Sequence, residues 1–195
     1  MLKKQYKMVF IGASVGGFNA LKQVLSVLPE DYPLPILVVQ HMLPTQKGRI
    51  TELLSPYCQL KLKFAENADI PLPGNVYFAP PDYHLRLDKS GVIMISNDEK
   101  IRHSRPSIDV LFCSVSKLAW SKRSIAVILT GANADGTEGA IAIKQSGGTI
   151  IVQDPKSAEN SIMPQSVMDA IKVDHIIWLD QIGSFLWDLS KTNQL

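Results

Sequence analysis

The sequence predicts an α/β fold: a doubly wound, predominantly parallel sheet with helices on both faces and a β-hairpin insertion. Short apolar runs, typical of strands buried on both faces, alternate with segments whose apolar residues recur at helical spacing. One pair of apolar runs in the middle of the chain is joined by a turn sequence, which predicts the hairpin. Alternating strands and helices imply parallel strands linked by crossover helices on both faces.

The first part of the chain predicts strands and helices in alternation. Residues 7–11 form a short apolar strand, and residues 16–28 form a helix because their apolar positions fall on one face. Residues 36–39 are a continuous apolar run and predict a buried strand. Residues 45–56 predict a second helix, and residues 60–64 alternate apolar and polar side chains as a half-buried strand does.

The middle of the chain breaks this pattern. Residues 76–79 predict a strand that ends at Pro80. Residues 83–87 and 92–95 predict a hairpin, because the turn sequence Asp-Lys-Ser-Gly separates them.

The remainder returns to alternating elements. A pair of glycines after residue 145 stops one helix, and Pro164 stands in the first turn of another. The expected strands are 124–129, 149–152 and 175–179, and the expected helices are 106–120, 137–145, 164–171 and 182–189.

Length and composition place limits on function. We expect residues 1–195 to form a single domain, and the net charge of +2 is too small to indicate nucleic-acid binding. Cys58 and Cys113 match neither a disulfide framework nor a metal-ligand spacing, so we expect no metal. The chain has no signal-peptide pattern and no apolar run of about 18 residues, which predicts a cytoplasmic protein without membrane insertion.

Functional residues in such folds gather where parallel strands end. Ser14 follows the first strand within Gly12-Ala13-Ser14-Val15-Gly16, which has the form of a nucleophile elbow. The backbone N–H of Val15 is then the first candidate oxyanion donor. The same segment is compatible with a dinucleotide-binding loop, although the expected glycine order is absent, or with a plain structural turn.

His41 follows the second buried strand and is the best placed of the four histidines to act as a general base. Asp135 lies in the loop after the strand 124–129. Its carboxylate could hold a histidine Nδ1–H, or it could cap the next helix with Glu138 completing the capping pattern. Ser14, His41 and Asp135 therefore follow different strands at the same edge of the predicted sheet.

Several segments together resemble the catalytic domain of CheB, the protein-glutamate methylesterases of bacterial chemotaxis. They occur in consistent order and cover most of the chain from Ile11 to Ile171: IGASVGG, VVQHM, LPGNVYFAPPDYHL, RHSRPSIDVLF, VILTGANADG, GGTIIVQD and MPQSVMDAI.

The resemblance implies hydrolysis of γ-glutamyl methyl esters on the cytoplasmic domains of methylated chemoreceptors, with release of methanol and without a cofactor. Members of the family also deamidate receptor glutamines. The family's catalytic serine, histidine and aspartate fall on Ser14, His41 and Asp135. The expected mechanism is acyl transfer in which His41 Nε2 takes the Ser14 proton and Asp135 holds Nδ1.

The chain departs from the family pattern in three respects. Val15 replaces the usual threonine after the nucleophile, and Ala132 and Asn133 replace methionine and glycine in the loop before Asp135. Many family members carry an N-terminal receiver domain. If 195 residues is the native length, control is expected to need a separate response-regulator partner, or none.

Two alternatives to an active esterase remain open at this stage. The altered positions are compatible with a catalytically degenerate binding module of the same fold, and the glycine-rich loop with a nucleotide-binding domain. For substrate binding, Arg102 and Arg105 are candidates to attract acidic receptor helices, and Met42 to line the site. A structural role for Arg105 near the start of the following helix is the competing interpretation.

Overall fold

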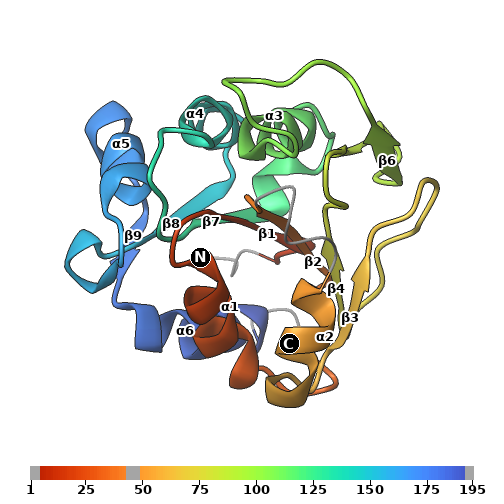
Figure 1. The fold of residues 1–195 in the computed structure, drawn as a ribbon, viewed down its shortest axis with the longest axis horizontal. Helices are drawn as coiled ribbons and strands as arrows, with labels where there is room; N and C mark the ends of the chain where they lie inside the picture. The colour runs from red at the N-terminus through yellow and green to blue at the C-terminus, as the bar shows by residue number, and fades with distance from the viewer. Residues whose placement is uncertain (1–4, 43–48, 192–195) are drawn as a thin grey trace.

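The computed structural model describes residues 5–42 and 49–191. These residues form a parallel sheet of seven strands in the order β3-β4-β2-β1-β7-β8-β9 (Figure 1). The strands are β1 (Met8–Ala13), β2 (Ile36–Gln40), β3 (Lys61–Phe64), β4 (Asn75–Phe78), β7 (Ser124–Ile128), β8 (Thr149–Gln153) and β9 (His175–Ile177).

Helices cover both faces of the sheet, as the sequence predicts (Figure 1). One face carries α1 (Gly17–Ser26), α2 (Ile50–Leu54) and α6 (Leu179–Lys191). The opposite face carries α3 (Ile108–Ser116), α4 (Thr137–Gln145) and α5 (Ile162–Ala170). Single 3₁₀ turns lie at Ser55–Tyr57, Ser121–Arg123 and Pro155–Ser157.

The central strand β1 illustrates why the apolar runs are uninterrupted. Val9 and Ile11 pack into the hydrophobic cluster under α1 and α6, whereas Met8 and Phe10 pack into the cluster under α3 and α4. Successive side chains of a strand point to opposite faces, so a strand covered on both sides must be apolar at every position.

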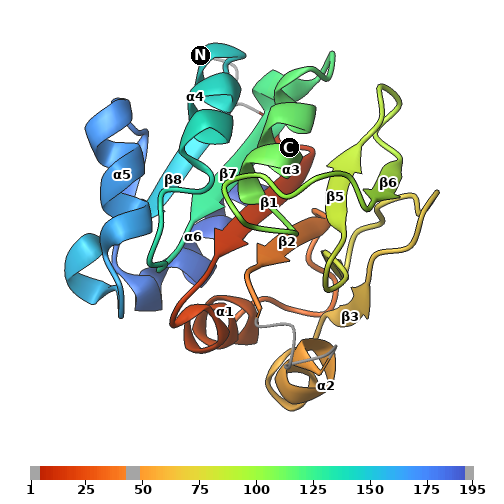
Figure 2. The ribbon, with the colours of Figure 1, turned by 45° about the horizontal axis from the view of Figure 1, so that its top comes forward.

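The insertion is an antiparallel hairpin of β5 (His84–Leu87) and β6 (Ile93–Ser96) (Figure 2). Its turn is held by the Asp88 carboxylate, which accepts hydrogen bonds from the backbone N–H groups of Ser90 and Val92. Strand β5 packs along α3: His84 contacts Ser107 just before the helix, and the Leu87 N–H donates to the Ser114 hydroxyl near its end.

The fold class and the hairpin are confirmed, and the differences concern element ends. The helix expected at 106–120 begins only at Ile108 and ends at Ser116. The strand expected at 175–179 stops at Ile177, because Leu179 already begins α6. The start of the helix expected at 45–56 lies outside the described residues, and its described part is α2 followed by a 3₁₀ turn.

The strand order determines where a site can form. Strand β1 pairs with β2 on one side and with β7 on the other, so the chain reverses its direction of winding around β1. Ligand sites of open α/β sheets lie outside the carboxyl ends of the strands at such a reversal.

Among the described residues, no helix combines the length and apolar character needed to cross a bilayer.

Candidate active site

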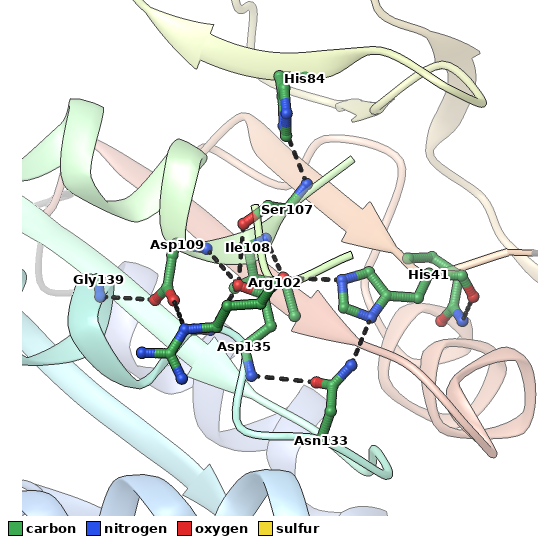
Figure 3. Close-up of polar contacts among 11 residues, drawn as sticks. His41, His84, Arg102, Ser107, Ile108, Asp109, Asn133, Asp135 and Gly139 are labelled. Carbon is green, nitrogen blue, oxygen red and sulfur yellow. Dashed lines mark hydrogen bonds and ion pairs between the residues drawn. The ribbon is translucent and has the colours of Figure 1, made fainter. Parts of the chain in front are cut away.

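The three predicted catalytic residues follow the three adjacent strands at this reversal. Ser14 comes directly after β1, His41 directly after β2, and Asp135 lies in the loop between β7 and α4. The His41 ring nitrogen Nε2 and the Asp135 oxygen Oδ2 are 2.8 Å apart (Figure 3). Ser14 and His41 line the same open cavity. The fold therefore brings together residues that are far apart in the sequence.

Ser14 lies in a tight turn between β1 and α1. Its N–H donates to the Thr130 carbonyl at 2.9 Å, and its own carbonyl accepts from the Gly17 N–H at 2.8 Å. Gly16 has a φ of 77°, a left-handed conformation that favours glycine. In the described part of the chain, no group accepts a hydrogen bond from the Val15 N–H. That N–H is thus available beside the serine hydroxyl.

Gln40 links the serine and histidine segments. Its side-chain amide donates to the Ser14 carbonyl at 2.8 Å and to the His41 carbonyl at 2.7 Å. The His41 N–H in turn donates to the Ala13 carbonyl at 2.9 Å. These contacts fix the backbone of both segments relative to each other, so the hydroxyl and the imidazole have little freedom to separate.

The Asp135 carboxylate is fully buried and accepts hydrogen bonds from several donors besides His41. It accepts from the backbone N–H groups of Ile108 at 2.7 Å and Asp109 at 3.0 Å, and from the Ser107 hydroxyl at 2.9 Å. These groups lie at the start of α3, so Asp135 caps a helix that precedes it in the chain.

The alternative in which Asp135 caps the following helix is therefore wrong. The N-cap of α4 is Gly136, with a φ of 93° and no side-chain cap. The Gly136 N–H does donate to the Asp135 Oδ1 at 3.0 Å, but the carboxylate as a whole turns toward α3 and His41.

The roles of the two imidazole nitrogens are also reversed relative to the expected mechanism. Asp135 contacts Nε2 rather than Nδ1. Nδ1 lies 3.5 Å from the Asn133 side-chain nitrogen, and Asn133 lines the cavity. Nδ1 is therefore the ring nitrogen that does not contact Asp135.

Burial would by itself raise the pKa of Asp135. The hydrogen bond from His41 and the N–H groups of Asp109 and Ile108 outweigh it and hold the pKa below its ordinary value. The neighbouring Asp109 behaves oppositely: burial, reinforced by repulsion from Asp135, raises its pKa to about 6. The Asp135 carboxylate is thus ionised at neutral pH, with a second, weaker acid, Asp109, beside it.

Arg102 lies beside Asp109, on the side of Asp135 that is away from His41 (Figure 3). Its guanidinium forms an ion pair with Glu138 and lies 4.0 Å from the Asp109 Oδ2. Arg102 and His103 both have positive φ, 48° and 65°, in the tight turn closed by the Ile101–Ser104 bridge. The turn separates the two side chains. His103 lines the cavity, whereas Arg102 contacts Asp109 and Glu138.

The cavity in front of Ser14 has a volume of about 970 Å³. Its wall includes Met42 and Arg105, two of the three predicted substrate contacts, but leaves out Arg102. Arg105 is also tied to the protein, donating to Asp82 at 2.9 and 3.0 Å and to the carbonyls of Asn97 and Asp98. The described lining residues besides Ser14 and His41 are Met42, Pro80, Pro81, Asp82, Tyr83, Lys100, His103, Ser104, Arg105, Pro106 and Asn133.

The hydrogen bonds of His84 give it a structural role. His84 is fully buried, its Nδ1 accepts the Ser107 N–H at 3.2 Å, and its Nε2 lies 3.0 Å from the Glu99 carbonyl. Both ring nitrogens are therefore used to hold the segment before α3. In the described part of the chain, no group of three or more His, Cys, Asp or Glu side chains is arranged to hold a metal ion.

Sequence reasoning missed two residues of the site, Gln40 and Asn133, as functional side chains. A signal was present for Gln40, since a polar residue interrupts the end of an apolar strand directly before His41. For Asn133, the sequence shows only that it replaces a glycine of the family pattern. Nothing in the neighbouring residues indicates that its side chain reaches His41.

Comparisons with known proteins identify the family of this chain. Residues 9–186 match the family model described as CheB methylesterase. A protein of Leptospira interrogans, provisionally named protein-glutamate methylesterase/protein-glutamine glutaminase, is 41% identical over 188 residues, covering 96% of this chain and 97% of the relative.

A second relative, from Pseudomonas fluorescens, is named protein-glutamate methylesterase/protein-glutamine glutaminase 2. It is 38% identical over 185 residues, and the match covers 94% of this chain and 48% of the relative. The chain thus spans about half the length of that protein, whereas it spans nearly all of the Leptospira relative.

The crystal structure of the Thermotoga maritima CheB methylesterase catalytic domain matches the model with a TM-score of 0.88. The two chains are 35% identical, and the match covers 95% of this chain and 99% of the other. Neither the nucleotide-binding alternative nor the degenerate binding module is favoured by these similarities.

Proposed function

Because the chain belongs to the CheB methylesterase family, we propose that it is a serine hydrolase that removes methyl esters from glutamate side chains of chemoreceptors. The observation that carries the proposal is the 2.8 Å contact between His41 and the buried Asp135, at the edge of the cavity that Ser14 lines. The names of the relatives support a second reaction at the same site, hydrolysis of receptor glutamine side chains.

In the proposed reaction, the Ser14 hydroxyl attacks the ester carbonyl and His41 Nδ1 takes its proton. Asp135 stabilises the imidazolium through Nε2, and the Val15 N–H donates to the oxyanion. Nδ1 then returns the proton to the departing methoxide, which leaves as methanol. Water attacks the acyl-enzyme, gives its proton to Nδ1, and releases glutamate as Ser14 regains its proton.

We also propose that the cavity receives an acidic helical segment of a receptor. Asp82 and Arg105 neutralise each other, so Lys100 supplies the positive charge that remains at the rim. Met42 and the prolines give the cavity an apolar wall for the ester methyl group and its chain. Arg102 is left out of this role, because its charge is taken up by Glu138 and Asp109.

The test is methanol release from methylated receptor membranes by the wild-type protein and by Ser14→Ala. We expect release to fall by several orders of magnitude in the variant, as for other catalytic serines. Ser104→Ala is a matched control, because Ser104 lines the same cavity. Release by Ser14→Ala at the wild-type rate would overturn the assignment of the nucleophile. If the wild type releases no methanol, labelling by a fluorophosphonate shows whether Ser14 is activated.

A further inference from the structure

Asn133 occupies the loop position between the catalytic aspartate and the cavity. Its side-chain oxygen accepts the Asp135 N–H at 3.0 Å, and its side-chain nitrogen faces His41 Nδ1 at 3.5 Å (Figure 3). The same side chain lines the cavity together with Ser14. One amide therefore touches the backbone of Asp135 and faces the nitrogen that must receive the Ser14 proton.

The orientation of this amide follows from its partners. A backbone N–H can only donate, so the end of Asn133 that meets the Asp135 N–H must be the carbonyl oxygen. The NH₂ group is then the end that faces Nδ1, and an N–H next to a ring nitrogen is favourable only if that nitrogen carries a lone pair. At the other side of the ring, the Asp135 carboxylate requires a proton on Nε2.

From these contacts we infer that Asn133 is a positioning residue, which holds the His41 ring with Nδ1 unprotonated and directed at the cavity. The inference rests on the proposed function, because an unprotonated Nδ1 matters for catalysis only if Nδ1 is the general base of that reaction. Asp135 anchors one end of the ring, and Asn133 prevents the other end from turning away. The contact is long, so it gives way when the Ser14 hydroxyl approaches Nδ1.

The decisive variant is Asn133→Asp, which is nearly isosteric. It keeps an oxygen to accept the Asp135 N–H but replaces the NH₂ group with a second acceptor, which favours a proton on Nδ1. If Asn133 only shaped the loop, this variant would behave as the wild type and Asn133→Gly would be the more damaged. If Asn133 positions the ring, Asn133→Asp is the more damaged.

The first readout is the rate at which a fluorophosphonate labels Ser14, which needs no receptor. We expect labelling to slow on the order of tenfold or more in Asn133→Asp, and by less in Asn133→Gly, because general-base assistance is lost. Asn19→Asp controls for the added charge, since Asn19 is an exposed residue of α1. Wild-type labelling rates in Asn133→Asp would overturn the inference.

The second readout is the nitrogen-15 NMR spectrum of the His41 side chain, which distinguishes protonated from unprotonated ring nitrogens. In the wild type at neutral pH we expect the unprotonated signal at Nδ1, and in Asn133→Asp a protonated Nδ1. A wild-type Nδ1 that carries the proton would overturn the inference even if every variant failed to fold. A protein that gives the expected spectrum and labelling but releases no methanol would refute the proposed substrate and leave the role of Asn133 standing.

Discussion

Replacing Asp135 with alanine should damage the fold as well as the chemistry. The carboxylate accepts from the backbone N–H groups of Ile108, Asp109 and Gly136 and from the Ser107 hydroxyl, all of which are buried. Asp135→Ala leaves these donors without a partner. Ser14→Ala, in contrast, removes a hydroxyl at the cavity wall and leaves the backbone contacts of Ser14 in place.

The size of the effect follows from the number of donors. A buried donor left unpaired costs about 1–3 kcal/mol, and water that enters the vacated space offsets part of this. Removing the carboxylate also removes the free-energy cost of burying it, which offsets a further part of the loss. At the lower end of the range, the donors at the start of α3 and α4 together amount to about 4 kcal/mol. For a domain of this size, that corresponds to a fall in Tm of roughly 10 °C.

The assay is urea and thermal unfolding of the wild type, Asp135→Ala and Ser14→Ala, with fluorophosphonate labelling alongside. Both variants should fail to label, but only Asp135→Ala should unfold at lower urea concentration. Asp135→Asn should lie between, because one oxygen is kept while an NH₂ group meets donors. An Asp135→Ala protein as stable as the wild type would refute the claim that this carboxylate caps α3.

Two further predictions concern the charges around the site. Asp109 binds its proton more tightly in the folded protein than in the unfolded chain. The free energy of unfolding therefore falls by about 3 kcal/mol as the pH rises from about 3.8 to about 6 and Asp109 ionises. The stability of Asp109→Asn relative to the wild type should therefore rise over that interval and level off above it, and a difference independent of pH would contradict the raised pKa. Lys100→Gln should lower kcat/KM for receptor substrate roughly two- to fivefold at low salt and reduce its salt dependence, while the hydrolysis of a small neutral ester stays unchanged. Lys89→Gln, in the hairpin turn, is the control, and an unchanged salt dependence in Lys100→Gln would argue against attraction at the rim.

Much of the site could be predicted because the strand-end rule requires little side-chain detail. Continuous apolar runs identify β1, β2 and β7, and parallel strands place the residues after them at one edge. That placement and chemical type make Ser14, His41 and Asp135 candidates, and the resemblance to CheB assigns their roles. Element ends were predicted less well: the fold decides whether Pro106 or Ile108 begins α3, because the cap comes from Asp135, far along the chain.

The chemistry of the site depends on which imidazole nitrogen contacts Asp135 and on the direction in which each side chain leaves a turn. Local sequence patterns do not encode either property. Adjacent residues of the 101–104 turn separate, with Arg102 beside Asp109 and His103 in the cavity, because two successive left-handed residues reverse the chain between them. His41 presents Nε2 to Asp135 while its backbone is held to Ala13 and Gln40. The proposed role of Nδ1 as the base depends on this placement. It follows that variants that loosen that backbone should slow catalysis even when Ser14, His41 and Asp135 are all present.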